Sequence, residues 1–156
     1  MLRRIISLVT HGLALAVGFG LGVYLLPILT APPAPDAAML EERAKDALFT
    51  GTLTRELAGS DFLHWGEGTL SVTQTQIVHE GALSPGPDYR LYLVPEFVED
   101  EVGFEALKDR AVQVGDIKTF SGFVVDLPEG VDVTAYTTAL VWCEAFSEFI
   151  TAAKYR

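Results

Sequence analysis

The chain has 156 residues, of which 49% are hydrophobic, and its formal net charge is −10. This length suits one domain with accessory segments. The charge is unevenly distributed, because Arg3 and Arg4 stand near the N-terminus whereas every acidic residue lies at or beyond Asp36. An acidic body repels phosphates, so this composition argues against nucleic acid as a partner.

The first predicted element is a helix over Ile5–Leu29, a segment with no Asp, Glu, Lys or Arg. Such a helix would be roughly 37 Å long, which exceeds the roughly 30 Å of bilayer hydrocarbon. A cleaved signal peptide has an apolar run of only about 7–15 residues, so we expect an uncleaved signal-anchor. Cleavage after Ala37 or Ala38 is the alternative. Arg3 and Arg4 favour a cytoplasmic N-terminus, which places the remainder in the periplasm or another extracytoplasmic space.

The same segment contains glycines at a spacing that allows helices to approach closely. Gly18 and Gly22 match the small-xxx-small pattern, which would permit a weak dimer. His11 lies near the cytoplasmic end of the span, where a neutral imidazole costs little. We therefore expect residues 1–30 to be a single-pass transmembrane anchor, with the membrane as its first partner.

Residues 31–50 are expected to form a linker and a short helix. The stretch APPAPDAA predicts a stiff, extended spacer that lifts the following domain off the bilayer. Asp36 can cap a juxtamembrane helix over residues 37–49, with Leu40 and Leu48 on its apolar side.

Residues 51–156 have the pattern of an all-β domain. Short runs of β-branched and aromatic residues are separated by glycine and proline signals, and the predicted strands are Gly68–Val72, Tyr89–Val94, Thr119–Leu127 and Thr138–Phe146. Strands of this length and spacing predict a small antiparallel β-sandwich or barrel. The acidic segment 95–101 is expected to be a solvated loop, and segment 104–110 a short helix or turn.

Two turn-rich stretches, DFLHWGEG and SPGPDYRLYL, are predicted to have structural roles. The candidate residues are His64, Trp65, Gly66, Gly68, Pro87 and Asp88. The glycines permit tight backbone geometry where a strand begins, and His64 can form a hydrogen bond within its turn. Asp88, which follows the rigid Pro87, can accept backbone N–H groups.

Catalytic and metal-binding motifs are weak. GxSxG, HExxH and GxxxxGK[ST] are absent. His64 and His79 could in principle form a mixed metal site with neighbouring acids; those acids are Asp61, Glu67, Glu80 and Asp88. Their spacing fits no known signature, so surface or loop histidines are favoured and we expect no metal and no cofactor.

Cys143 is the only cysteine, which excludes an intramolecular disulfide, paired-cysteine zinc sites and CxxC redox motifs. In a strand, Val141, Cys143 and Ala145 would share one face, and Leu140, Trp142 and Glu144 the other. Apolar surroundings and the neighbouring Glu144 would raise the thiol pKa, which disfavours a nucleophile. Two interpretations stay open: an inert core cysteine, or a one-electron redox group with Trp142 as a relay.

Residues from about Gly51 to Tyr155 resemble the DM13 domain family. The resemblance rests on LHWGEGTLSV, GPDYRLYL, the Leu127–Pro128 pair and the terminal YTTALVWCEAFSEFITAA. It implies a small β-rich extracytoplasmic domain that takes part in electron transfer, with Cys143 as the redox group. The chain has no DOMON segment and no CxxCH haem-attachment motif, so the resemblance implies a haem-type or DOMON-like redox partner on another chain. The alternative is a non-catalytic binding or adhesion module in which Cys143 fills the core; a stand-alone enzyme is not expected.

Overall fold

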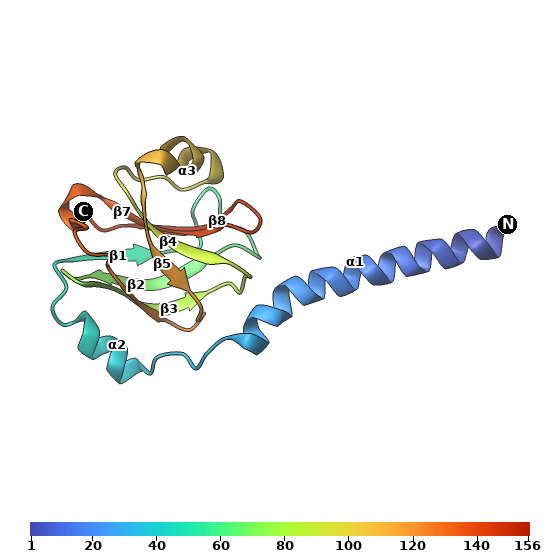
Figure 1. Cartoon of the computed structure of the whole chain (residues 1–156), viewed down its shortest axis with the longest axis horizontal. Coiled ribbons are helices and arrows are strands. Elements are labelled where there is room, and N and C mark those ends of the chain that lie inside the picture. Colours follow the sequence, from blue (N-terminus) through green and yellow to red (C-terminus); the bar gives the residue numbers. More distant parts are fainter.

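The computed structural model describes all 156 residues as a long helix that runs out from a β domain (Figure 1). The helix, α1 (Leu2–Thr30), has no buried residue and contains Pro27 near its C-terminal end. It is the one helix that is long and apolar enough to cross a membrane. Helix α1 covers the whole apolar segment Ile5–Leu29 predicted from the sequence, because neither the glycines nor Pro27 in this segment interrupt it.

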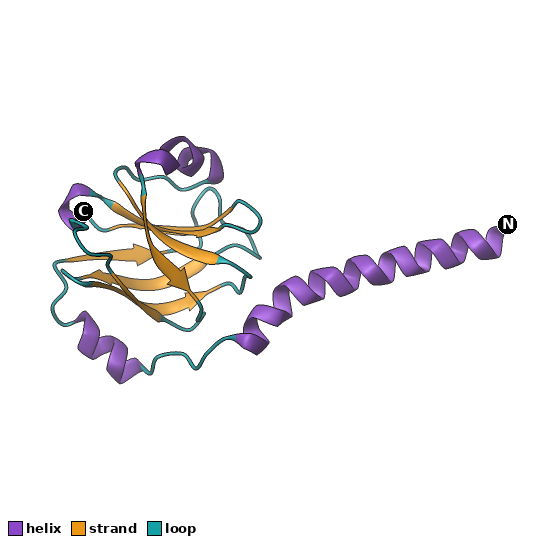
Figure 2. Cartoon of the chain, viewed as in Figure 1, coloured by secondary structure: helices purple, strands orange, loops and turns teal.

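The domain contains two four-stranded antiparallel sheets, with the strand orders β1-β2-β3-β6 and β5-β4-β7-β8. The first sheet consists of β1 (Phe49–Leu53), β2 (Gly66–Val72), β3 (Gln76–Leu83) and β6 (Phe123–Asp126). The second consists of β5 (Val112–Ile117), β4 (Tyr89–Val94), β7 (Thr138–Cys143) and β8 (Glu148–Lys154). Short helices lie at the periphery of the strands (Figure 2). These are α2 (Ala37–Ala44), α3 (Glu101–Leu107) and the 3-10 turns η1 (Lys108–Arg110) and η2 (Val133–Ala135).

Side chains of both sheets share one hydrophobic core, as in a β-sandwich. This core of 19 buried residues includes Leu70 and Ile77 from the first sheet and Leu91 and Val141 from the second. A second cluster of seven buried residues, centred on Phe104 and other aromatic side chains, lies beneath α3 on the outer face of β4, β7 and β8. Strands β4 and β7 are therefore covered on both faces, so they lack the polar alternation of half-exposed strands.

Helix α2 is shorter than the predicted 37–49 helix. Asp36 caps its start by accepting a hydrogen bond from the Met39 backbone N–H at 2.8 Å, as expected. The helix ends at Ala44, because Phe49 begins β1 and pairs with Val72. Leu40 is only 5% exposed and lies against Gly122, which attaches α2 to the first sheet.

The proline-rich linker does not hold the domain at a distance from α1. Pro32 lies beside Gly86 and Lys118, and Pro33 and Pro35 line a shallow groove with Asp116. Of the three prolines only Pro35 is partly buried, and Pro32 and Pro33 are exposed. Whether the linker lifts the domain off a bilayer stays a prediction.

Three of the four predicted strands have different bounds. The strand predicted over Gly68–Val72 begins two residues earlier, at Gly66. Thr138–Phe146 is not one strand: β7 ends at Cys143, a turn occupies residues 144–147, and β8 follows. Thr119–Leu127 contains only the short strand β6. Tyr89–Val94 has the predicted bounds. The predicted helix over 104–110 begins earlier, at Glu101, because Asp100 caps it through the Gly103 backbone N–H.

Candidate functional site

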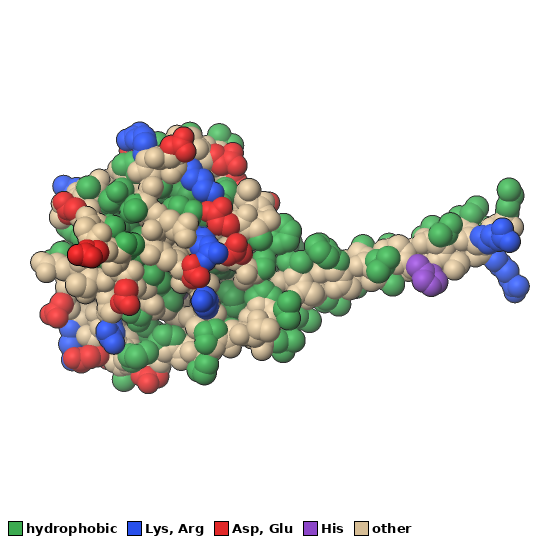
Figure 3. All heavy atoms as spheres, viewed as in Figure 1, with side chains coloured by type: hydrophobic (Ala, Val, Ile, Leu, Met, Phe, Trp, Pro, Cys, Tyr) green, Lys and Arg blue, Asp and Glu red, His purple; other side chains and the backbone are tan.

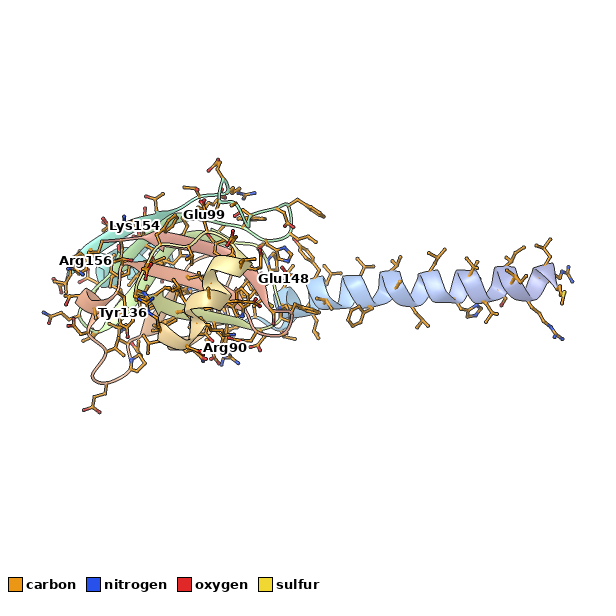
Figure 4. All side chains as sticks on the ribbon, turned by 90° about the horizontal axis from the view of Figure 1, so that it is seen from above. Arg90, Glu99, Tyr136, Glu148, Lys154 and Arg156 are labelled. Carbon is orange, nitrogen blue, oxygen red and sulfur yellow. The ribbon has the colours of Figure 1, made fainter.

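Cys143 lies at the end of β7, on the end of the domain that faces α1. Its neighbour on one side is Tyr89 at the start of β4, and its neighbour on the other is Glu148 at the start of β8. Figure 4 shows Glu148 at this end of the domain, next to the point where α1 leaves it. The antiparallel arrangement of β4, β7 and β8 thus brings together three residues that are distant in sequence or separated by a turn.

The thiol is almost completely enclosed. Cys143 is 3% exposed and belongs to the core between the sheets, as the predicted alternation requires. It also lines a cavity of about 370 Å³ between the domain and α1, together with Leu63, Pro87, Tyr89 and Phe146. The cavity wall on the other side is formed by α1 residues; these are Phe19, Gly20, Val23 and Tyr24. Cys143 therefore stands between the packed core and an apolar cavity at the end of the domain that faces α1.

The surroundings of Cys143 keep its thiol protonated. Burial raises the pKa of Cys143, and the carboxylate of Asp88 acts in the same direction, while the backbone N–H groups of Phe146, Asp88 and Ala145 oppose this shift. The acid expected to act on the sulfur was Glu144, but its carboxylate lies on the other face of β7. There it accepts hydrogen bonds from Lys108 Nζ at 2.8 Å and from the Tyr92 hydroxyl. The neutral thiol is a poor nucleophile.

Trp142 faces away from Cys143, into the cluster beneath α3. It is 1% exposed, and its ring centroid lies 4.8 Å from that of Phe104. Its indole nitrogen has no hydrogen-bond partner. The Lys108 ammonium lies 5.2 Å from the Trp142 ring centroid, which stabilises the neutral indole and opposes a positive charge on it. This electrostatic environment disfavours an indole radical cation.

Tyr89 is a residue of the site that the sequence did not single out. Its side chain is 3% exposed, and burial raises the pKa of its hydroxyl. The hydroxyl lies 3.4 Å from Ser84 Oγ. A Cβ on Gly86 would lie 2.3 Å from the Tyr89 ring, so the glycine of SPGPDY is required for the ring to sit there. The proline-glycine turn directly before β4 was the sequence signal that could have identified Tyr89.

The DFLHWGEG stretch forms the loop beside the cavity. Asp61 accepts backbone hydrogen bonds from Leu63 and His64, both at 2.7 Å, and also contacts the His64 ring. Trp65 stacks with the Arg55 guanidinium, 3.3 Å from the ring centroid. The Trp65 backbone N–H donates to Ser84 Oγ at 3.1 Å. His64 thus lines the cavity from a loop that is tied to the Tyr89 turn.

The glycines of this stretch are needed for close approach of neighbouring strands. A Cβ on Gly66 would lie 2.5 Å from Thr151 Cγ2. Gly68 has φ of +122°, and a Cβ there would lie 2.2 Å from the Glu80 carbonyl oxygen. Both positions agree with the prediction of tight geometry at the start of a strand.

Pro87 and Asp88 form the turn before β4, but Asp88 does not have the predicted partners. Its carboxylate pairs with Arg90 Nη2 at 2.8 Å, since the arginine is the nearest strong donor. The backbone carbonyl of Asp88 accepts the Glu144 N–H at 3.0 Å, which connects this turn to the end of β7. Pro87 lines the cavity.

The two histidines considered as metal ligands are separated and have other partners. His79 is fully buried in β3, and its Nε2 lies 3.0 Å from the Glu67 carbonyl oxygen. A carbonyl oxygen only accepts, so Nε2 carries the proton. His64 instead pairs with Asp61 at the surface. The structure therefore does not bring His64 and His79 together into the histidine-carboxylate metal site that was considered from the sequence.

The fold and the site define a two-sheet β domain that follows an apolar helix and encloses one thiol at the helix-facing end. A family model described as electron transfer DM13 matches residues 58–155. The chain belongs to the DM13 family. No curated protein and no solved structure matches the chain.

Proposed function

We propose that this protein is a membrane-anchored, extracytoplasmic DM13 domain that takes part in electron transfer through Cys143. Residues 1–30 would be the anchor, residues 31–50 the linker and α2, and residues 51–156 the functional domain. The proposal is supported by membership of a family described as electron transfer DM13. The single structural observation that carries it is that the only thiol lines the apolar cavity next to α1.

The proposed orientation rests on the distribution of charge. Arg3 and Arg4 precede the apolar helix, and such residues are retained on the cytoplasmic side. All 21 acidic residues lie beyond the helix, on the side proposed to be exported. Figure 3 shows the charged side chains spread over the domain surface, whereas apolar side chains dominate the helix.

The chemistry that fits the site is one-electron oxidation of the thiol coupled to loss of its proton. The electron would pass to a haem-type or DOMON-like protein on another chain, and re-reduction by a donor would restore the thiol. Glu148 lies opposite Cys143 in the β7–β8 register and lines the same cavity, so its carboxylate is one candidate to accept the proton. The carboxylate of Asp88, which acts on the pKa of Cys143, is the other. Tyr89 shares the Cys143 side of the sheet and is a better-placed relay than Trp142.

A second function is favoured by the burial of the same residue. A side chain that is 3% exposed, with a raised pKa and apolar neighbours, has the properties of an inert core cysteine. In that case the domain would be a non-catalytic binding or adhesion module, and the cavity would serve binding or packing only.

Voltammetry of the full-length protein in lipid nanodiscs distinguishes these functions. Cys143→Ala removes the thiol, and Val141→Ala is the matched control because it deletes a buried side chain from the same face of the same strand. If Cys143 is a redox group, an oxidation wave is present in the unchanged protein and in Val141→Ala, and is lost in Cys143→Ala. If the three proteins give the same waves, the electron-transfer role of Cys143 is wrong and the binding module stands.

A further inference from the structure

The end of the domain that faces α1 carries exposed apolar side chains on two separate loops. Phe62 is 85% exposed, more than any other large hydrophobic residue that follows α1 in the chain. Its neighbour Leu63 is 39% exposed, and Phe146 in the β7–β8 turn is 47% exposed. We call these three residues the apolar loop edge. Figure 3 shows apolar side chains gathered where the domain meets the helix.

The apolar loop edge lies at the level of α1 where a bilayer interface would fall. About 20 helical residues cross the hydrocarbon layer, so a span that begins near Ile5 leaves it near Tyr24. Tyrosine is enriched at this boundary because its ring is apolar and its hydroxyl is polar. Tyr24 lines the same cavity as Leu63 and Phe146. The two loops are thus at the depth of the lipid headgroups.

The connection between α1 and the domain keeps the loop edge in this position. Residues 31–36 separate the end of α1 from the start of α2, and such a segment spans at most about 20 Å. Pro35 of this segment is partly buried and lines a shallow groove with Asp116 of the domain. Leu40 of α2 is 5% exposed and packed against the domain. The domain therefore has little freedom to move away from the end of α1.

The charge of the edge shows which force would hold it against lipid. Asp61 adjoins Phe62, and Glu148 lines the cavity beside Phe146. These acids would be repelled by anionic headgroups, so electrostatic attraction does not draw this face to a membrane. Partial insertion of Phe62, Leu63 and Phe146 into the headgroup and acyl boundary is the remaining attraction, and it depends on apolar area.

We propose that the apolar loop edge is seated in the outer interface of the bilayer that α1 crosses, so that the cavity beside Cys143 opens toward lipid. This inference rests on the proposed function in one respect, namely that α1 spans the bilayer. The occupant of the surface is a fluid phospholipid bilayer, and neither a second copy of the chain nor a soluble partner is needed to cover it.

The test uses full-length protein in nanodiscs of neutral phospholipid, with bromine atoms near the headgroup end of the acyl chains as fluorescence quenchers. Phe62→Trp reports on the loop edge, and Phe146→Trp provides a second reporter on the other loop. Lys154→Trp is the control, because Lys154 is exposed and lies at the opposite end of β8 from Glu148, about 20 Å away. Tyr24→Trp reports separately on α1. Fluorescence of the unchanged protein is subtracted.

We expect Phe62→Trp and Phe146→Trp to be quenched at least about twofold more strongly than Lys154→Trp, with Tyr24→Trp quenched as well. Equal quenching at 0.1 and 0.5 M salt would support apolar insertion, and release at high salt would overturn it. Quenching of Tyr24→Trp alone would refute the seated edge while the anchor stands. Absence of quenching at all positions would refute the anchor itself. Equal quenching of Lys154→Trp would show that the domain has no fixed orientation on the membrane, which also overturns the inference.

Discussion

Trp142 and Cys143 are adjacent in the chain but lie in different cores. Cys143 packs between the two sheets, whereas Trp142 packs with Phe104 beneath α3. The alternation of a β-strand produces this separation, because successive side chains point to opposite faces. A pair that looks like a donor and its relay in the sequence is therefore divided by the sheet, and the aromatic ring on the thiol side is that of Tyr89.

The enclosure of Cys143 predicts slow thiol labelling. In folded full-length protein, N-ethylmaleimide should react with Cys143 at least about 100-fold more slowly than in urea-unfolded protein, because labelling requires local opening. Since burial raises the thiol pKa, the thiolate fraction at a given pH is smaller than for an ordinary thiol. The labelling rate should thus keep rising above about pH 8.5, where the unfolded chain levels off. Rapid labelling at pH 7 would contradict the enclosure.

Glu144 should contribute to stability only while it is ionised. Burial alone would raise its pKa, but hydrogen bonds from Lys108 and Tyr92 hold the pKa of Glu144 below its ordinary value. A carboxylate with a lowered folded pKa stabilises the protein above its unfolded pKa of about 4.3, and this contribution is lost as the pH falls through the folded pKa.

The variant Glu144→Gln tests this contribution. At pH 7 it should lower the free energy of unfolding by about 1–2 kcal/mol, measured by urea titration. Below about pH 4 the two proteins should converge in stability, because the carboxylate is then protonated. Glu105→Gln, an exposed residue of α3, serves as the control and should have little effect. A difference that persists undiminished at low pH would point to packing instead of charge.

His79 should make the fold sensitive to mild acid. Burial lowers the pKa of His79, and its hydrogen bond to the Glu67 carbonyl only partly opposes this shift. The unfolded chain therefore binds a proton near pH 6.5 that the folded chain binds at lower pH, so stability falls as the pH is lowered below about 6.5. In the variant His79→Gln, the melting temperature should vary less between pH 7 and pH 5.5. His64→Gln is the control at the surface, and an equal flattening by it would contradict the assignment to His79.

Gly68 should tolerate no side chain. Its φ of +122° is strained for other residues, and a Cβ would collide with the Glu80 carbonyl oxygen at 2.2 Å. Gly68→Ala should cost about 3 kcal/mol of unfolding free energy, because strain and collision add. Gly130 offers a matched control, since it also has positive φ, +83°, but nothing lies within 4 Å of its Cβ position. Gly130→Ala should cost about 1 kcal/mol. Equal costs in thermal or urea unfolding would show that the collision at Gly68 is relieved by movement of β3.

The sequence predicted those elements that have strong local signals. β4 has the predicted bounds because proline stands on both sides of it, and the Asp36 cap is a local hydrogen bond. The β7–β8 turn was missed because EAFS has no glycine, asparagine or proline; Ser147 adopts φ of 55° there. The sequence analysis therefore predicted one strand over Thr138–Phe146 and did not predict β8 as a separate strand.

Only the part of the candidate site that depends on local sequence was predictable. The face of Cys143 follows from alternation within one strand, which is a local property. Its neighbours Tyr89 and Glu148 follow from strand pairing, which the sequence does not reveal because register depends on contacts between distant segments. The partner of Glu144 likewise required the position of α3, which brings Lys108 over β7.

The closed surroundings of Cys143 also bear on chemical damage. In an oxidising compartment an accessible lone thiol would cross-link two copies of a protein or be converted irreversibly to sulfinic and sulfonic acids. A side chain that is 3% exposed escapes both reactions as long as the β7–β8 hairpin stays in place. The lifetime of the reduced sulfur is thus set by the opening of this hairpin. Mutations that loosen the hairpin should speed oxidation of Cys143 even where they leave the average structure intact.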